Sequence, residues 1–329
     1  MAKGIGRLIQ FGIAKEATRG TPESAATYYI PVAELSIDDK NEKVLDEQSI
    51  GVIEDSNGQS IIKEWAEAQI TAPIGDKHFP LMLLGALGSL STGDNPDSDA
   101  SVKDHTITVG QSAQHQALTL FLDDPLGAQD YKYGLGVLQS LEIKYELGKF
   151  LMYTATFKSK KGATATLTPS TTTENRFLPK HLTFKLASAA SGLGAASATS
   201  IKSLTLKIEK NLEDDDVLGS ATPADFLNRQ LTISGNIEAI WQNESDFKTA
   251  FLAGTAKAMR LDLTNSDVTL GVSANPRVLI DLNKVIFSEL SRSMGINDVV
   301  KQSLEFKGHY STTDSKMITA TVTNTVASY

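Results

Sequence analysis

Alternation between apolar and polar residues at every second position dominates this chain from one end to the other. Leu204, Leu206 and Ile208 are separated by polar residues, and segments 141–145 and 318–322 follow the same rule. Alternation with period two places all apolar side chains on one face of a strand, which is typical of antiparallel sheets with one buried face. The pattern therefore predicts a mainly β protein.

Helical periodicity is confined to two short segments, residues 76–87 and 244–253, each amphipathic and each opening with acidic or capping residues. Each segment closes a series of strand, long polar excursion, strand and short helix. That series spans residues 33–88 and recurs over residues 202–254. A series of elements that occurs twice in one chain indicates a duplicated unit. We therefore expect two tandem β-sandwich or half-barrel domains, each with one short α-helix.

The boundary between the expected domains falls in a polar, Thr-rich stretch, residues 168–176, whose composition suits a linker. We assign residues 1–170 to the first domain and residues 171–329 to the second, and each is long enough to bury its own core. The first copy carries an insertion after its helix, residues 91–105. Its turn-forming composition predicts an exposed loop.

Two long polar excursions, residues 38–63 and 209–229, occupy the same place in both copies and exceed the length of ordinary hairpin connections. Each mixes acidic residues with apolar ones. Because a disordered loop has no need of so much apolar surface, we expect both excursions to dock onto another subunit. The apolar residues assigned to that contact are Val44, Leu45, Ile50, Val52 and Ile53 in the first excursion and Val217, Leu218, Phe226 and Leu227 in the second.

Composition narrows the function classes. A net charge of −8 and a pI near 5.2 argue against a protein that grips a phosphate backbone, because that affinity comes from Lys and Arg. The absence of cysteine excludes disulfides, thiolate nucleophiles and zinc-finger sites. No apolar run is long enough to span a membrane, and the first 20 residues do not resemble a signal peptide, so a soluble, cytosolic origin is expected.

No constellation of residues indicates an active site. The five histidines lack metal-ligand spacing and are expected to be scattered over the surface or half buried, and the acidic run 213–216 lacks the pattern of a calcium loop. No phosphate-binding loop or nucleophile elbow occurs. We expect no catalytic residue, no cofactor and no metal, and we interpret Trp65 and Trp241 as core or interface anchors.

The segments 7–32, 35–58 and 63–88 together resemble the tail tube (major tail) proteins of long-tailed bacteriophages, in particular the group with two tube domains fused in tandem. The resemblance covers nearly the whole chain and is strongest over residues 7–88 and 204–254. No catalytic motif defines this family. The resemblance rests on extended similarity and on the duplicated order of elements.

The resemblance implies a structural subunit in place of an enzyme. Six single-domain tube proteins form a ring around a channel, so a two-domain subunit needs three copies, and the stacked rings conduct DNA during ejection. In such a tube the long loops reach the neighbouring ring. The implied partners are further copies of the chain, the tape measure protein, the tail terminator and baseplate or tip proteins, with passing DNA not bound specifically and no membrane. The implied location is the virion tail, assembled in the cytoplasm of the bacterial host.

A channel for DNA should not present many basic groups, since these would hold the phosphates. Strand parity therefore selects polar residues as candidates to face the lumen. They are Glu34, Ser36, Asp38, Glu67, Gln69, Ser203, Thr205, Glu209, Thr232, Ser234, Asn236 and Glu238. Lys207 departs from this acidic and neutral set, and pairing with an adjacent carboxylate would neutralise it.

Two alternatives stay open at this stage. The chain could be the tube of a contractile or pyocin-like tail, which a sheath would distinguish. It could also be a carbohydrate-binding or adhesion protein of the virion, because such proteins are likewise β-rich, acidic and free of cysteine. The second alternative predicts aromatic residues clustered on exposed faces.

Overall fold

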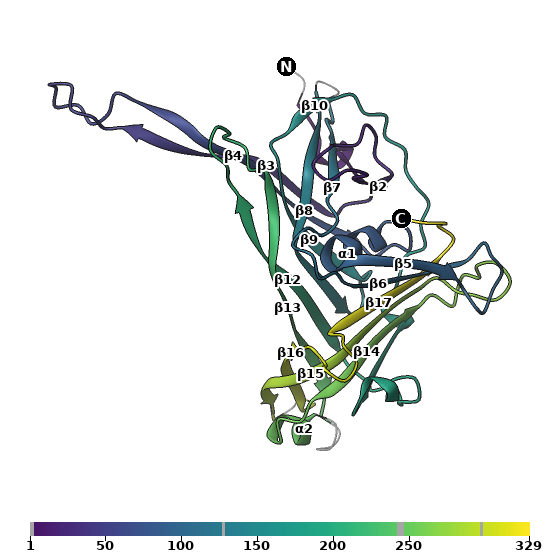
Figure 1. Cartoon of the computed structure of the whole chain (residues 1–329). Coiled ribbons are helices and arrows are strands. Elements are labelled where there is room, and N and C mark those ends of the chain that lie inside the picture. Colours follow the sequence, from purple (N-terminus) through teal and green to yellow (C-terminus); the bar gives the residue numbers. More distant parts are fainter. Residues whose placement is uncertain (1–2, 127–128, 242–246, 297–298) are drawn as a thin grey trace.

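The computed structural model describes residues 3–126, 129–241, 247–296 and 299–329. The chain is mainly β, as predicted, and its strands pair antiparallel in one continuous hydrogen-bonded network (Figure 1). The strands are β1 (Gln10–Lys15), β2 (Tyr28–Ile30), β3 (Glu34–Asp46), β4 (Gly58–Pro73), β5 (Gly88–Asp94), β6 (Lys103–Val109), β7 (Leu118–Asp123), β8 (Asp130–Glu146), β9 (Met152–Ser159), β10 (Ala163–Ala165), β11 (Leu182–Ala187), β12 (Ser203–Asp215), β13 (Asp225–Ile240), β14 (Lys257–Thr264), β15 (Arg277–Ser293), β16 (Lys301–Gly308) and β17 (Ile318–Asn324). The helices are α1 (Phe79–Leu87) and α2 (Lys248–Leu252), with 3-10 turns η1 (Gly6–Leu8), η2 (Pro179–His181) and η3 (Ala190–Gly192).

One long sheet, which we call the wall, runs in the order β3-β4-β9-β8-β12-β13-β16-β15. Its strands alternate between buried and solvent-facing residues, as in β12, where Leu204, Leu206 and Ile208 are buried and their neighbours are not. The alternation predicted from the sequence therefore produces a wall with one apolar and one polar face.

Two smaller sheets cover the apolar face of the wall. The first has the order β2-β1-β7-β8-β10, and the second has the order β11-β14-β15-β17-β6-β5. The long strands β8 and β15 each belong to the wall along one part and to a smaller sheet along the other. The apolar residues between these layers form one continuous buried cluster with members from both halves of the chain.

The helices are shorter than predicted. α1 begins only after His78, and Gly88, with φ 94°, ends it in a left-handed conformation that glycine adopts without strain. Every residue of α1 is buried, so the predicted amphipathic character is wrong for this helix, which lies between sheets instead of on a surface. α2 covers only part of the predicted segment, and residues 244–246 lie outside the described residues.

The insertion 91–105 is largely exposed, as predicted, but it is only partly a loop, because its two ends belong to the strands β5 and β6. β6 pairs along its length with β17 near the other end of the chain, for example Ala320 opposite Ile107. The stretch expected to be a linker is also packed. Asn175 donates to the Asp76 carboxylate from its backbone N–H at 2.9 Å and from its side-chain amide at 2.7 Å. The two halves are thus joined by strand pairing and by hydrogen bonds.

Candidate assembly surfaces

The polar face of the wall gathers every residue that strand parity selected for the lumen. Residues directly opposite each other in neighbouring strands share a face of the sheet. Ser36 lies opposite Gln69 in β3 and β4, and Thr205 lies opposite Asn236 in β12 and β13. Candidates from distant parts of the sequence therefore form one surface.

The same face carries charged residues that the parity argument left out, among them Lys144 and Lys158. Several of its lysines form ion pairs, whereas Lys307, opposite Ser234, is an exposed lysine of the same face. The Lys207 Nζ lies 2.5 Å from the Glu209 carboxylate, which confirms the pairing expected for Lys207, and the Lys144 Nζ lies 3.0 Å from Glu142. Alternation along β8, β9 and β16 would have found these residues, since they occupy the solvent-facing positions of those strands.

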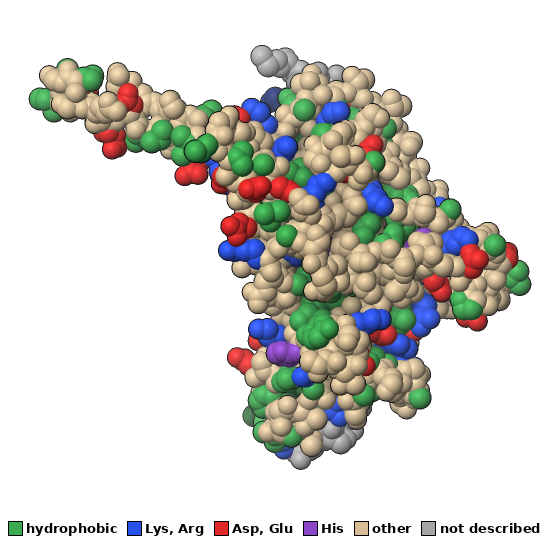
Figure 2. Space-filling view, viewed as in Figure 1, with side chains coloured by type: hydrophobic (Ala, Val, Ile, Leu, Met, Phe, Trp, Pro, Cys, Tyr) green, Lys and Arg blue, Asp and Glu red, His purple; other side chains and the backbone are tan. Residues whose placement is uncertain are grey.

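The β3–β4 hairpin projects far from the body of the protein as an arm (Figure 1). The excursion expected between these strands is largely strand, because β3 extends to Asp46 and β4 resumes at Gly58. Hydrophobic side chains line the arm in the space-filling view (Figure 2). All five apolar residues assigned to a subunit contact here are exposed, beginning with Val44 at 51 %. Ile61 and Ile62, which were not predicted, extend this apolar surface.

The β12–β13 hairpin, in contrast, is held against the first half of the chain. Phe226 is fully buried in a cluster with Ala117, Leu135 and Val137, against which Trp65 packs. Phe226 is therefore not available as a surface contact, although Val217 and Leu218 are exposed, and Leu227 is half buried. The prediction that Phe226 contacts another subunit is wrong, because residues of the same chain cover this side chain.

An ion pair fixes this docked hairpin. The Arg19 guanidinium donates to both Asp225 carboxylate oxygens, with its Nε 3.0 and 2.9 Å away. Burial alone would raise the pKa of Asp225, but the hydrogen bonds from Arg19 and from the Phe226 backbone N–H hold that pKa below its usual value. A second cluster places Asp214 within 2.8 Å of both Lys63 and Lys158.

Lys210 makes a further contact between the halves from inside the protein. Its Nζ donates to the carbonyl oxygen of Gly85 near the end of α1, at 2.7 Å. Burial, with a smaller contribution from the nearby Arg19 charge, lowers the pKa of Lys210 to about 7. The hydrogen bond places the Lys210 amine beside the carbonyl groups at the end of α1.

The wall has two open edges. Among the described residues, β3 pairs only with β4, and the last part of β15 pairs only with β16. Within the wall, each strand is hydrogen bonded to its neighbours, including β8 to β12 at the middle of the wall. Unpaired strand edges expose backbone N–H and C=O groups and are templates for pairing with another chain.

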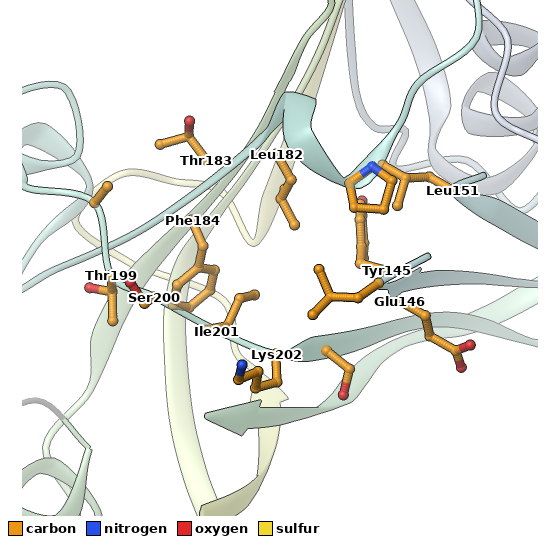
Figure 3. A pocket seen from close by; sticks show the side chains of 14 residues that line it. Tyr145, Glu146, Leu151, Leu182, Thr183, Phe184, Thr199, Ser200, Ile201 and Lys202 are labelled. Atoms are coloured by element: carbon orange, nitrogen blue, oxygen red, sulfur yellow. The ribbon is translucent and has the colours of Figure 1, made fainter. Parts of the chain in front are cut away.

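The described residues form several pockets, and the His78–Glu174 pair lines one of them. One pocket of about 250 Å³ lies between the end of β8, β11 and the segment before β12, and is lined by residues such as Tyr145, Phe184 and Ile201 (Figure 3). Within the described residues, no group of three or more acidic or His side chains is placed to hold a metal ion. No described helix has the length and hydropathy needed to cross a membrane.

The histidines differ from the prediction, because four of the five are buried. The His78 Nδ1 lies 2.6 Å from the Glu174 carboxylate, which ties the stretch between the halves to the start of α1. The two ring nitrogens of His105 are hydrogen bonded to the Thr92 hydroxyl and the Asn324 side chain, and burial lowers the pKa of His105. These contacts join elements from different parts of the chain, which is a structural use of histidine.

Together these features define a mainly β protein whose most extensive surface is a polar sheet face bounded by open strand edges and a projecting arm. A family model described as phage tail tube protein matches residues 6–308, so the chain belongs to the phage tail tube protein family. This family is a structural component of the phage tail. A search of curated proteins finds no match to this chain.

Proposed function

We propose that three copies of this chain form a ring and that the rings stack into a hollow tail tube which conducts DNA during ejection. In this proposal each chain contributes two tandem tube domains, residues 1–170 and 171–329, and has no catalytic role. The tube lies in the virion tail and is assembled in the host cytoplasm. Its ends meet the tail terminator and the baseplate or tip, and a tape measure protein sets its length.

The repetition of strand pairing supports the tandem domains. The wall pairings β3–β4, β4–β9 and β9–β8 have counterparts in β12–β13, β13–β16 and β16–β15. The irregularities recur too. The β8–β9 register shifts between Leu138 and Ser140, and the β15–β16 register shifts between Phe287 and Glu289. Bulges are specific local features, so their recurrence at matching positions favours duplication of one unit.

The open edges of the wall support ring closure. Within one chain, β8 of the first half pairs with β12 of the second half. If the halves are equivalent, β15 would pair with β3 of the next copy in the same manner, and the wall would continue around a closed barrel. Closure removes the free edges that otherwise promote uncontrolled association. Three chains would then give the arrangement of six single-domain subunits.

The charge pattern of the polar face supports a role in DNA passage. Several lysines on this face, such as Lys207 and Lys144, form ion pairs with carboxylates of the same chain, and Lys307 is an exposed lysine of this face. Acidic residues of the same surface, such as Asp38 and Glu67, are exposed. A surface on which many basic groups are neutralised by neighbouring carboxylates holds phosphates only weakly, so DNA would slide along it.

The exposed arm supports stacking. Its apolar side chains project from the body of the protein and are exposed (Figure 2). We assign Val44, Leu45, Ile50, Val52 and Ile53 to the contact with the neighbouring ring, together with Val217, Leu218 and Leu227 near the docked hairpin. Stacking of this kind is heterologous and open-ended, which produces a filament.

The proposal depends most on the two open edges of one polar wall, and cryo-electron microscopy of the concentrated protein tests it. We expect hollow rings or tubes with three chains per ring and the polar face lining the channel. A protein that stays monomeric at high concentration, or an assembly with the polar face outside, would refute the proposal.

A further inference from the structure

The seam between β8 and β12 shows how the two halves join inside one chain. Its register places Leu206 opposite Ile143 and Ile208 opposite Leu141 on the apolar face. All four of these side chains are fully buried. On the polar face Lys207 lies opposite Glu142. We call the β8–β12 pairing the inner seam. It serves as a template for the pairing of β15 with β3 of another copy that ring closure requires.

The bulges allow that pattern to be transferred residue by residue. The shift between Asn211 and Leu212 in β12 has its counterpart between Glu42 and Lys43 in β3, as the shifts in β8 and β15 also match. Aligning strands on their bulges fixes both the register and the face of each side chain. We call the expected junction between β15 of one copy and β3 of the next copy the outer seam. Transferring the register of the inner seam to it gives five pairs of opposite residues, which are Ser36 with Ser293, Ile37 with Arg292, Asp38 with Ser291, Asp39 with Leu290 and Lys40 with Glu289.

One difference between the two seams carries information about the partner. Ile208 of the inner seam corresponds to Asp39, and Ile143 corresponds to Arg292. These two positions are diagonal neighbours on the apolar face, close enough for a long side chain to bridge. Where the inner seam has two apolar residues, the outer seam has one acidic and one basic residue. Such a pair of opposite charges is expected at a junction whose partner is selected by charge complementarity.

The surroundings of Arg292 agree with this role. Its guanidinium stacks on the Trp241 ring at 3.6 Å from the ring centroid, which holds the side chain beside the open edge. Its Nε is buried and has no hydrogen-bond partner among the described residues. Asp39 is exposed on the opposite edge of the wall, where its Oδ1 accepts a hydrogen bond from the Gly162 backbone N–H at 2.9 Å.

We propose that β15 of one copy pairs with β3 of a second copy in the register of the inner seam, and that Arg292 and Asp39 form an ion pair across that junction. This inference rests on the proposed ring. Lys40 and Glu289, directly opposite each other on the polar face, add a second complementary pair. The two pairs distinguish the outer seam from the inner one and so direct each open edge to the correct partner.

Cysteine cross-linking tests the register, because the wild-type chain contains no cysteine. Directly opposite residues lie within disulfide range, whereas residues two positions further along lie at or beyond its limit. We expect Asp38→Cys with Ser291→Cys to cross-link chains in assembled tubes, up to closed trimers. Ser36→Cys with Ser293→Cys should do the same if the first pair impairs folding. Asp38→Cys with Ser293→Cys should cross-link at least about fivefold less.

A matched control lies inside the chain. Thr205 and Lys144 are opposite each other in the inner seam. Thr205→Cys with Lys144→Cys should therefore form an intrachain disulfide without linking copies, which calibrates the reaction. Stronger linkage through the shifted pair than through both proposed pairs, in intact tubes, would overturn the register and leave the proposed tube standing. Failure of wild-type protein to form rings would instead contradict the proposed function.

Substitution with the residues of the inner seam tests the ion pair. Arg292→Ile or Asp39→Ile alone should raise the critical concentration for assembly on the order of 10- to 100-fold, because each leaves one charge without its partner. Arg292→Ile combined with Asp39→Ile should restore assembly to within about threefold of wild type, as in the apolar inner seam. If Arg292 acts only through Trp241 in its own chain, the change at Asp39 will not rescue it, and that result would refute the pair.

Discussion

The two long hairpins of the wall have strands of the same lengths, 13 and 16 residues each, yet they meet different surroundings. The β12–β13 hairpin is covered by the first half of the chain, where Phe226 is buried and Asp225 binds Arg19. The β3–β4 hairpin has no such cover, and Val44 and Ile53 are exposed. The docked hairpin shows what kind of surface a hairpin of this design contacts. In the proposed tube, another copy would supply a surface of this kind to the free arm.

Removing the end of the free arm should have the largest effect. We expect replacement of residues 47–57 by an Asn-Gly turn to abolish tube formation, because it deletes Ile50, Val52 and Ile53, which are assigned to the proposed contact between rings. The melting temperature of the unassembled chain should change by less than about 2 °C, since residues 47–57 are exposed at the end of the arm. Electron microscopy and circular dichroism measure the two outcomes.

The same replacement of residues 216–224 in the docked hairpin is the control. It removes the Asp216 ion pair with Lys63, 2.6 Å long, and the hydrogen bond from the Glu64 backbone N–H to Ala221. It should lower the stability of the unassembled chain, unlike the first replacement. Normal tubes from the variant without the free arm would show that the arm has no role in stacking.

Truncation of Phe226 should have the next largest effect. Phe226→Ala leaves a cavity in a fully buried cluster and should cost about 3–5 kcal/mol in the free energy of unfolding. Gln59 occupies the matching position in the free arm and is exposed. Gln59→Ala should change stability by less than about 0.5 kcal/mol. Urea denaturation of both variants compares the two hairpins directly, and equal effects would mean that the docked contact contributes nothing.

Breaking the Arg19–Asp225 pair should follow. Asp225→Asn leaves a largely buried guanidinium without its partner and should cost about 2–4 kcal/mol. The folded pKa of Asp225 is lowered, so its contribution is fully present above the unfolded pKa near ~3.9 and is lost as pH falls through the folded value. The gap in stability between wild type and variant should therefore shrink in acid. Asp55→Asn, in the exposed arm, should show neither effect.

Lys210 should give the smallest effect, visible in its pH dependence. Its folded pKa of about 7 lies below the unfolded value near ~10.4, so the unfolded chain binds more protons between these limits. Wild-type stability should rise with pH in this window by up to about 1 kcal/mol per pH unit relative to Lys210→Met. Lys43→Met, on the exposed arm, should leave the slope unchanged. A Lys210→Met curve parallel to wild type would contradict the buried, neutral lysine.

The candidate site was partly accessible from sequence. Parity grouped the polar residues of four strands correctly, because a side chain in a strand alternates faces whatever its neighbours are. It missed Lys144 and Lys158, although their strands alternate in the same way. The open edges could not be anticipated, since pairing of β8 with β12 joins residues far apart in the chain.

The sequence by itself determined the strands, the faces of the wall and the repeated order of elements, because these follow from a two-residue period and from local composition. It also placed apolar residues in both hairpins. Only the tertiary structure decided that one hairpin is covered and the other free. That outcome depends on contacts such as Arg19 with Asp225, separated by 206 positions, and on the insertion whose strand β6 pairs with β17. Local sequence patterns identify the apolar side chains that burial would stabilise, whereas long-range packing decides whether the same chain buries them.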